Sequence, residues 1–350
     1  LDAPEPALAL DLLDALHRGA GEEALACYTR LFYTLEEGGH GSLGAWLWDA
    51  LRYQESPYAR MVEEGREDAA LASAAARDVE TFSALAALDC GALVEEMAGL
   101  LPAEYAGVCA GLPRWENAAP FDFEGLTAFY RTHGGGLFAQ YRAFLWEGGM
   151  LRPVADPDSP RPEEMLGYRR QREQVEANTR ALLEGRAVNN VLLYGESGTG
   201  KSATVKSLLS LPGFEDLRLI EVQKEELSGL PRLIRQLSGR RAKFILFIDD
   251  LAFDQDDRTY SALKTILEGG LEKRPANVAI YATSNRRHLV RQTFSDRAGD
   301  EVDAFETIQE KTSLAERFGL RIPYLSMTKP EYLDMVEAMA AQAGITMERE

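Results

Sequence analysis

A glycine-rich pattern that ends in a lysine and a serine lies near the middle of the chain. Residues 191–202 read Val-Leu-Leu-Tyr-Gly-Glu-Ser-Gly-Thr-Gly-Lys-Ser, a short apolar run that enters Gly-x-x-x-x-Gly-Lys-Ser. Glycines in such a loop let the backbone turn tightly and point its N–H groups at phosphate oxygens, and the following helix adds the positive end of its dipole. The pattern therefore predicts a phosphate-binding loop between a strand and a helix. A turn that binds nothing is the alternative.

The chemistry of this loop depends on its last residues. Lys201 would reach the β- and γ-phosphates of a nucleotide, and the Ser202 hydroxyl would bind Mg²⁺. Glu196 is unusual here, because its carboxylate would repel phosphate unless the side chain points to solvent. We expect ATP or ADP, with Mg²⁺, to contact a continuous stretch of the chain: Gly195, Glu196, Ser197, Gly198, Thr199, Gly200, Lys201, Ser202 and Ala203.

Two adjacent acids follow a second apolar run. Residues 244–248 are apolar throughout, which is typical of a central strand buried on both faces of a parallel sheet, and Asp249 and Asp250 come next. Asp249 would orient Mg²⁺ through its water shell, and Asp250 stands where many ATPases have a glutamate that polarises the attacking water. The two acids could instead cap the next helix. Their position after a phosphate-binding loop favours the catalytic interpretation.

Asn285 and Arg317 are further candidates for catalysis. Asn285 follows an apolar run at 278–282 and would reach the γ-phosphate if that strand is inserted between the strands that carry the loop and the acids. Ser284 or Thr283, just before it, is the next candidate for this role. A role in a turn is the alternative. Arg317 closes a helical stretch just before the apolar run at 320–325. In an oligomeric ATPase an arginine at this point stabilises charge on the neighbouring subunit's nucleotide, whereas a salt bridge or a helix cap is the alternative.

The elements that must position these residues alternate between strands and helices. Apolar runs separated by helical stretches predict a parallel sheet covered by helices on both faces. The expected fold class is α/β, with a five-stranded P-loop sheet. Its strands are predicted at 191–194, 217–222, 244–248, 278–282 and 320–325.

The first 150 residues show a different pattern. Apolar side chains recur there at helical spacing, for example over 25–35 and again over 137–145 after a run of three glycines. We therefore expect an all-helical domain over residues 1–150. The proline-rich segment 151–162 is the predicted linker.

Charge separates the same parts of the chain. Residues 1–150 carry 24 acids against 9 arginines and no lysine, a net charge of −15, whereas the remainder carries 32 acids against 29 bases, a net charge of −3. An acidic surface repels phosphate, so a nucleic-acid partner is not expected. Solubility alone or an acidic docking surface would each account for the charge. We expect residues 1–150 to recruit a protein partner, preferably a basic one.

The sequence gives no membrane or zinc signal. No apolar run approaches the length that crosses a bilayer, and no leader-like segment begins the chain, so we expect a cytoplasmic protein. Cys27, Cys90 and Cys109 lack the spacing of zinc ligands, and we expect them to be buried free thiols.

The assembled motifs resemble a known family. Residues 163–344 look like the core of an AAA+ ATPase, and several stretches are similar to the bacterial family catalogued as domain of unknown function 815. These stretches are residues 189–195, 248–251, 267–272 and 281–289. The resemblance implies that Gly167 and Tyr168 lie against the adenine. It also implies that Asn285 is the first sensor and that Arg317 is the arginine finger of a homo-oligomer.

Two departures from the AAA+ pattern limit what the resemblance implies. Asp249 and Asp250 replace the usual Asp-Glu pair, so the shorter second side chain implies slow hydrolysis. After a nucleotide-binding core at 163–327, residues 328–350 supply only the start of a helical lid, and the second sensor arginine of such lids is not among them.

The favoured function is a Mg²⁺-dependent ATPase that couples ATP hydrolysis to remodelling or loading of a partner held by the helical domain. A nucleotide-controlled binding module that hydrolyses little is one alternative. A P-loop kinase that phosphorylates a small molecule is another. A kinase would need an acceptor pocket and an arginine-bearing lid, and the inserted strand with Asn285 argues against it.

Overall fold

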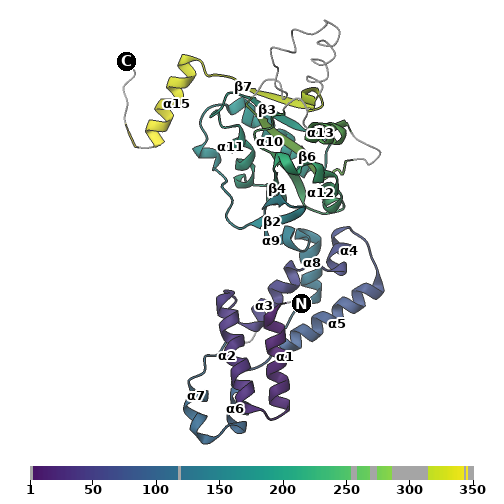
Figure 1. Ribbon diagram of the computed structural model, residues 1–350, viewed down its shortest axis with the longest axis vertical. Coiled ribbons are helices and arrows are strands. Elements are labelled where there is room, and N and C mark those ends of the chain that lie inside the picture. Colours follow the sequence, from purple (N-terminus) through teal and green to yellow (C-terminus); the bar gives the residue numbers. More distant parts are fainter. Residues whose placement is uncertain are drawn as a thin grey trace. The chain divides into compact units, whose positions relative to one another are not determined.

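The computed structural model describes residues 3–116, 120–253, 258–268, 274–285, 314–342 and 344–345. The chain divides into two compact units, residues 1–139 and 140–350 (Figure 1). Buried apolar clusters lie within each unit, as separately packed domains require.

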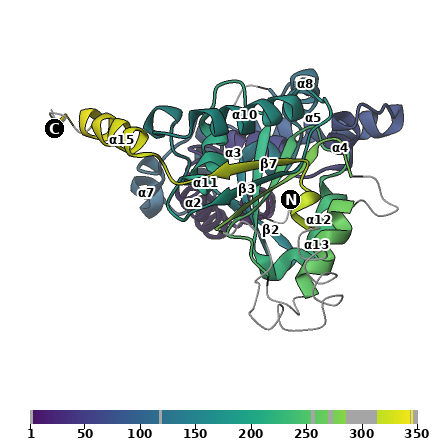
Figure 2. The ribbon, with the colours of Figure 1, turned by 90° about the horizontal axis from the view of Figure 1, so that it is seen from above.

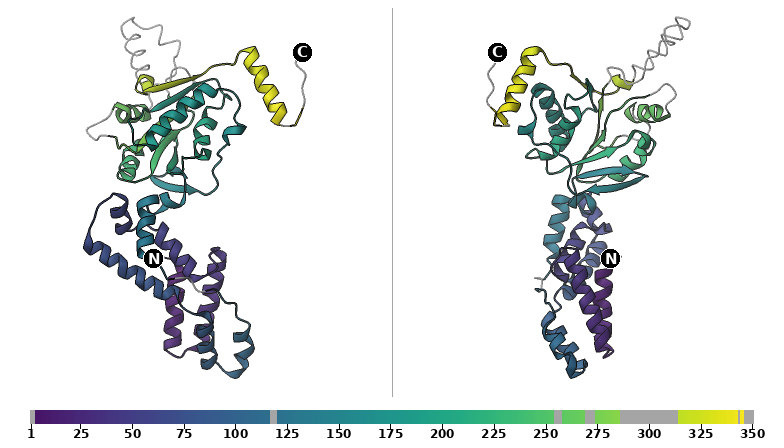
Figure 3. Two further views of the ribbon diagram at one scale, coloured as in Figure 1. Left: turned by 180° about the vertical axis from the view of Figure 1, so that it is seen from behind. Right: turned by 60° about the vertical axis from the view of Figure 1, so that its left-hand side comes forward.

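Helices build the first unit in the part of the chain that the structure describes (Figures 1 and 3). They are α1 (Pro4–His17), α2 (Gly21–Glu37), α3 (Leu43–Tyr53), α4 (Pro57–Glu63), α5 (Ala69–Ala86), α6 (Cys90–Leu100), η1 (Ala103–Tyr105), α7 (Ala106–Ala110), α8 (Phe123–His133) and α9 (Leu137–Gln140). Serine or aspartate side chains accept a backbone N–H at the start of several helices, which satisfies donors that the helix itself leaves unpaired. These caps are Ser42, Ser56, Asp68, Asp89 and Asp122.

Aromatic residues organise the apolar clusters of the helical unit. One cluster gathers α1, α2 and α6 around Tyr28, whose ring stacks on Trp115 with centroids 5.3 Å apart and whose hydroxyl donates to the Pro113 carbonyl at 2.7 Å. Another gathers α4, α5 and α8 around Tyr58 and Tyr130. Large rings bury much apolar surface, so these contacts hold the helices together.

Seven strands of the described residues form one sheet in the second unit, in the order β2-β1-β4-β5-β6-β3-β7. They are β1 (Ala143–Glu147), β2 (Met150–Val154), β3 (Val191–Gly195), β4 (Leu217–Val222), β5 (Lys243–Ile248), β6 (Val278–Ser284) and β7 (Leu320–Tyr324). β1 and β2 pair antiparallel through Gly148 and Gly149, whose φ angles of 56° and 74° suit a tight hairpin. The other neighbours pair in parallel.

Helices cover both faces of this sheet, as the sequence predicts. On one face α10 (Arg169–Leu183) and α11 (Lys201–Lys206) pack through Val175 and Val205 against strand residues such as Phe247. Figure 2 shows α12 (Leu230–Leu237) and α13 (Arg258–Glu268) on the other side. The 3₁₀ segments are η2 (Pro162–Glu164), η3 (Ser207–Ser210) and η4 (Lys224–Gly229), and α15 (Lys329–Gln342) follows β7 (Figure 3).

The described sheet has seven strands where the sequence predicts five. The additional pair begins where a helix is predicted over 137–145, but α9 ends at Gln140 and β1 begins at Ala143. Phe144 and Trp146 are buried on β1, which pairs with β4. Tertiary pairing thus overrides an apolar spacing that also fits a helix.

The observed boundary between the units also differs from the predicted one, because β1 and β2 belong to the sheet. The sequence places it at residue 150, with a linker at 151–162, but the structure divides the chain at residue 139 and β2 reaches Val154. Pro153 is tolerated in β2 because this strand lies at the edge of the sheet, where one side needs no N–H donors. The helical unit therefore ends before β1.

The described residues contain no helix that is long and apolar enough to cross a membrane. Cys27, Cys90 and Cys109 form no disulfide, and Cys90 and Cys109 are buried. Within the same residues no group of three or more His, Cys, Asp or Glu side chains could hold a metal ion.

Trp146 tests the assignment of residues 143–147 to the sheet. Its side chain is fully buried, so we predict that Trp146→Ala lowers the free energy of unfolding by about 3–5 kcal/mol. Met150→Ala on β2, where the side chain is 62% exposed, is the control and should change it by less than about 0.5 kcal/mol. Denaturant unfolding measures both variants. Equally small effects of both substitutions would contradict the assignment of residues 143–147 to a buried strand.

Candidate functional site

The glycine-rich loop lies between β3 and α11, in the strand-loop-helix context that its pattern requires. Gly195 has a φ of 147°, and a Cβ added there would lie 1.9 Å from the carbonyl oxygen of Tyr324 on β7. Gly198 and Gly200 have φ angles of 78° and 82°, which residues with a side chain rarely adopt. The shape of the loop therefore depends on these glycines.

Lys201 lies inside the loop. It is 5% exposed, and its Nζ donates to the carbonyl oxygens of Gly195 at 3.2 Å and of Glu196 at 2.5 Å. Burial lowers the pKa of this ammonium, while Asp250 and Asp249 act in the opposite direction. A buried ammonium held by neutral carbonyls gains from contact with an anion, and phosphate oxygens would supply that contact.

Asp249 connects the loop to two strands. Its Oδ1 accepts hydrogen bonds from Ser202 Oγ at 2.6 Å, from Thr283 Oγ1, and from the backbone N–H of Asp250 at 3.1 Å. These residues meet because β5, β6 and β3 are consecutive neighbours in the sheet and their carboxyl ends lie at one edge. The strand inserted between the acids and the phosphate loop, on which the interpretation of Asn285 depends, is therefore present as β6.

Ser202 and Asp249 fit a magnesium ion by their chemistry. Together they offer a hydroxyl and a carboxylate oxygen, the hard ligands that Mg²⁺ prefers. Mg²⁺ keeps several waters and takes further ligands from nucleotide phosphates, so a pair of protein side chains beside a phosphate loop suits this ion.

Asp250 and Asn285 meet beside this pair. Nδ2 of Asn285 donates to Oδ1 of Asp250 at 2.8 Å, and the N–H of Asp250 donates to Oγ1 of Thr283 at 2.9 Å. Asp250 has a φ of 47°, a left-handed conformation that is uncommon outside glycine and costs on the order of 1 kcal/mol. The contacts orient the Asp250 carboxylate at the same edge of the sheet as Asp249.

Thr283, which the sequence offers behind Asn285 as a polar residue at the tip of β6, belongs to this network. Its hydroxyl joins Asp249 to the backbone of Asp250. The parallel register sets Ile248 of β5 opposite Ala282 of β6, so the next residue on β6 must lie beside the acids. The contact of Thr283 with the acids can be predicted only once β5 and β6 are known to be neighbours.

A cavity of about 770 Å³ joins the phosphate loop to residues 160–172 and 324–335. Its volume lies in the range of small-molecule sites. The predicted nucleotide-binding residues that line it are Gly167, Tyr168, Glu196, Gly198, Thr199, Gly200 and Ala203. Apolar residues that sequence reasoning missed also line it, namely Met165, Leu166, Met327, Tyr332 and Met335. The apolar part of this lining, next to a phosphate loop, suits the base of a nucleotide.

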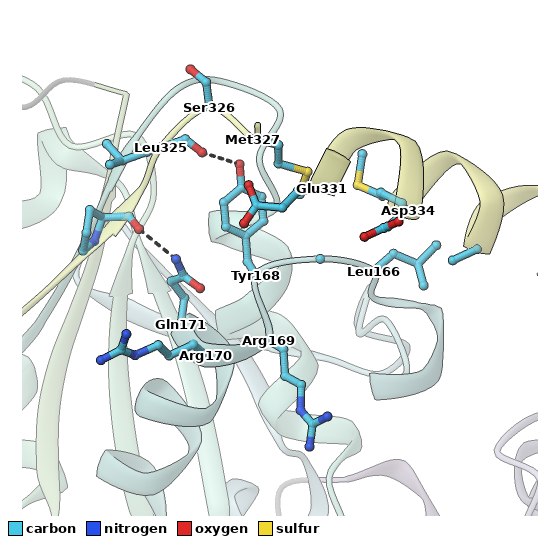
Figure 4. A pocket seen from close by; sticks show the side chains of 14 residues that line it. Leu166, Tyr168, Arg169, Arg170, Gln171, Leu325, Ser326, Met327, Glu331 and Asp334 are labelled. Carbon is cyan, nitrogen blue, oxygen red and sulfur yellow. Dashed lines mark hydrogen bonds between the residues drawn. The ribbon is translucent and has the colours of Figure 1, made fainter. Parts of the chain in front are cut away.

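Tyr168 and Gly167 shape this cavity with consecutive left-handed φ angles of 47° and 72°. The Tyr168 hydroxyl donates to the Leu325 carbonyl at 2.7 Å (Figure 4). The Tyr168 ring centroid lies 4.8 Å from that of Tyr324. An adjoining cavity has a volume of about 590 Å³. Figure 4 shows residues of its lining, among them Glu331 and Asp334 of α15. The segment predicted to contact adenine is therefore tied to the end of β7.

Glu196 does not place its charge in the loop's interior. The residue is exposed, and its carboxylate accepts a hydrogen bond from Ser326 Oγ, in the segment between β7 and α15. This contact removes the expected conflict with phosphate. It could not be foreseen from the sequence, because it depends on β7 lying beside β3.

Arg317 lies near the amino ends of the parallel strands, whereas the phosphate loop lies at their carboxyl ends. It precedes β7, which pairs in parallel with β3 from Leu320 opposite Val191 to Tyr324 opposite Gly195. The phosphate loop follows the carboxyl end of β3, so the five-residue strand β7 separates the two sites by roughly 16 Å at ~3.3 Å per residue. Within the described chain, Arg317 is not brought to the phosphate loop of its own subunit.

The chain is similar to one family and to several solved structures. The model of the family described as "Protein of unknown function (DUF815)" matches residues 139–350. Residues 269–272 and 286–289, which carry part of that resemblance in the sequence, lie outside the described residues. No curated protein matches the chain significantly.

The similarity to solved structures is low in both sequence identity and TM-score. RuvB from Thermotoga maritima, a Holliday junction branch migration motor, is 16% identical with a TM-score of 0.33, over 55% of this chain and 56% of that chain. The Orc1 protein from Aeropyrum pernix, solved in complex with DNA, is 19% identical with a TM-score of 0.34, over 54% of this chain and 52% of that chain. The chain thus spans little more than half the length of either structure.

Lys201 tests the phosphate loop. Lys201→Ala removes a charge-assisted contact worth about 1.5–3 kcal/mol, so we predict an affinity for Mg-ATP at least about tenfold weaker. Lys206→Ala removes the same charge from the last turn of α11 and should leave the affinity within about twofold. Calorimetry on both variants makes the comparison, and equal affinities would contradict the role of Lys201.

Proposed function

The chain belongs to the DUF815 family, and on that premise we propose that it is a Mg²⁺-dependent AAA+ ATPase that couples ATP hydrolysis to remodelling or loading of a protein partner. The observation that carries the proposal is the network at the carboxyl ends of β3, β5 and β6, where Asp249 joins Ser202 to Thr283. A phosphate loop beside two acids supplies the positioned charges that phosphoryl transfer to water requires.

ATP binding would use the groups that now face one another across the loop. Lys201 Nζ would exchange the carbonyl oxygens of Gly195 and Glu196 for phosphate oxygens. The base would enter the apolar cavity beside Tyr168. Ser202 and Asp249 would hold Mg²⁺, which when bound neutralises charge on the β- and γ-phosphate oxygens.

Asp250 is the proposed general base. Asn285 donates to one of its carboxylate oxygens, which leaves the second oxygen to accept a proton from the attacking water. Asn285 would also orient that water toward the γ-phosphate, and Lys201 would stabilise charge on the departing phosphate oxygens. Aspartate is shorter than the usual glutamate, so we expect slow turnover.

Arg317 would act on the nucleotide of a neighbouring subunit. Its side chain is exposed, and β7 separates it from the phosphate loop of its own chain. A head-to-tail contact between identical subunits would bring this edge of one sheet to the nucleotide of the next. A guanidinium there stabilises charge on the transferred phosphoryl group, so a homo-oligomer is part of the proposal.

A nucleotide-controlled binding module is the second candidate. The Asp250 side chain favours this second function because it is one methylene shorter than glutamate and one of its carboxylate oxygens already accepts a hydrogen bond from Asn285. Such a protein would bind ATP and change its surface between nucleotide states while hydrolysing little.

The helical unit is the proposed partner-binding part of the chain. Residues 1–139 carry 23 acids against 8 arginines, a net charge of −15, whereas the sheet unit is close to neutral. A basic protein is the partner that this charge favours. The expectation against nucleic acid and the cytoplasmic location both stay predictions.

Asp250→Asn separates the two candidate functions. The substitution keeps the size of the side chain but removes the charge that polarises water, so for an ATPase we predict a loss of phosphate release of about 100-fold with Mg-ATP affinity retained. A binding module would release little phosphate with either side chain. Asn285→Ala should likewise reduce turnover more than affinity. Turnover that survives in Asp250→Asn would place the base elsewhere.

Arg317 tests the assembly. Arg317→Ala should bind ATP yet hydrolyse it poorly, whereas Arg321→Ala, which removes an exposed arginine from β7 itself, should retain activity. Mixed Arg317→Ala and Asp250→Asn subunits should recover some phosphate release, because an interface can pair an intact Asp250 with a neighbour's intact Arg317. No recovery in subunits shown to co-assemble would leave Arg317 with a structural role.

A further inference from the structure

The helical unit contains an apolar groove that the proposed ATPase site does not use. It is a cavity of about 370 Å³ between α5 on one side and the junction of α3 and α4 on the other. Tyr58, Leu126 and Tyr130 are buried residues of its lining. The wall that α5 contributes consists of Leu71, Ala74, Ala75, Asp78, Val79 and Phe82.

These α5 residues form one continuous stripe of the helix. They recur at the i, i+3, i+4, i+7 spacing that places side chains on one face, a face that usually packs against a neighbour. Yet α5 buries only Val79 and Ala86 among its 18 residues. Ala74 is exposed, and Leu71 and Phe82 are only half-buried. Within the described unit, much of this face of α5 is therefore still open to solvent.

The groove has the dimensions of a helix-binding surface. The stripe from Leu71 to Phe82 extends about 16 Å at ~1.5 Å per residue, which is about three helical turns. Ala74 and Ala75 lie in the middle of the stripe, and side chains this small let a second helix approach closely.

The lining favours an apolar occupant over a polar small molecule. The Tyr130 hydroxyl already donates to the Leu51 carbonyl, and the Tyr58 hydroxyl lies 2.8 Å from that of Thr127. Four other lining residues are polar or charged, namely Gln54, Glu55, Ser56 and Asp78, and all the rest are aliphatic or aromatic. Hydrophobic burial, which is proportional to apolar area, would therefore supply the affinity.

The rim of the groove is acidic. Asp78 on α5 and Glu55 on the opposite wall are both exposed, and the described lining residues include no lysine or arginine. Arg60 lies near, at 3.9 Å from Glu55, and compensates that carboxylate in part. The net charge of −15 over residues 1–150 adds attraction for a cationic partner at longer range.

We propose that this groove binds an amphipathic helix of a partner protein, with leucine-like side chains against α5 and basic side chains facing Asp78 and Glu55. This is the helix-in-groove mode of recognition. A second copy of the helical unit would bring its own acidic surface to the rim, so a basic partner is the better match. The proposal deepens the partner-binding role given above, and its test uses the full chain without nucleotide, so its failure would leave the ATPase proposal standing.

The probe is a labelled peptide of about four helical turns, with leucines at i, i+3, i+4 and i+7 and lysines on the opposite face. Fluorescence anisotropy should show it binding at least about tenfold more tightly than a scrambled peptide of the same composition. Two pairs of α5 variants then locate the site. Asp78→Lys is matched by Glu80→Lys, and Ala74→Trp by Ala84→Trp, because each pair changes exposed residues of the same helix inside and outside the groove.

We expect Asp78→Lys and Ala74→Trp to weaken peptide binding by about tenfold. The control variants Glu80→Lys and Ala84→Trp should change the affinity by less than about twofold. Circular dichroism confirms that all four variants keep their helix content. Equal binding by groove variants and their controls, or equal binding of the scrambled peptide, would overturn the proposal. Self-association of the full chain that Ala74→Trp abolishes would also overturn it, because the occupant would then be a second copy.

Discussion

One carboxylate oxygen holds the candidate site together. Oδ1 of Asp249 accepts hydrogen bonds from Ser202 on α11, from Thr283 on β6 and from the backbone of Asp250. Because three donors share one acceptor, none of them can shift without disturbing the others. The arrangement requires β6 between β5 and β3 with their carboxyl ends level. Separately, β7 approaches the loop so closely that only glycine fits at position 195.

The parts of the site that could be predicted from the sequence are those encoded by a few consecutive residues. The phosphate loop and the acids after β5 are short patterns attached to apolar strands, and both lie where those patterns indicate. Thr283 is a candidate from its place at the end of a strand, but its contact with Asp249 could not be predicted, and neither could the contact of Ser326 with Glu196. Both contacts join segments that are distant in the sequence. The apolar wall of the cavity carries no motif at all.

The error over 137–154 has a physical cause of the same kind. The apolar residues of β1 fall at spacings that also fit a helix, and the prolines that follow are typical of a linker. What decides the structure is the free edge of β4, which β1 covers while burying Phe144 and Trp146. Local spacing could not reveal that edge. The two consecutive glycines at 148 and 149 were the available sign of a hairpin.

The segment between β7 and α15 is hydrogen-bonded from two sides by residues that line the larger cavity. Tyr168 binds the carbonyl of Leu325, and Glu196 binds the hydroxyl of Ser326. A ligand that enters the cavity and moves Tyr168 or Glu196 would also move the segment that leads into α15. Linkage between two ligands is reciprocal, so if the cavity's ligand changes the affinity of α15 for a partner, that partner changes the affinity of the cavity for its ligand by the same factor. Ligand binding in the cavity and partner binding at α15 would then be coupled, although the two ligands share no contact.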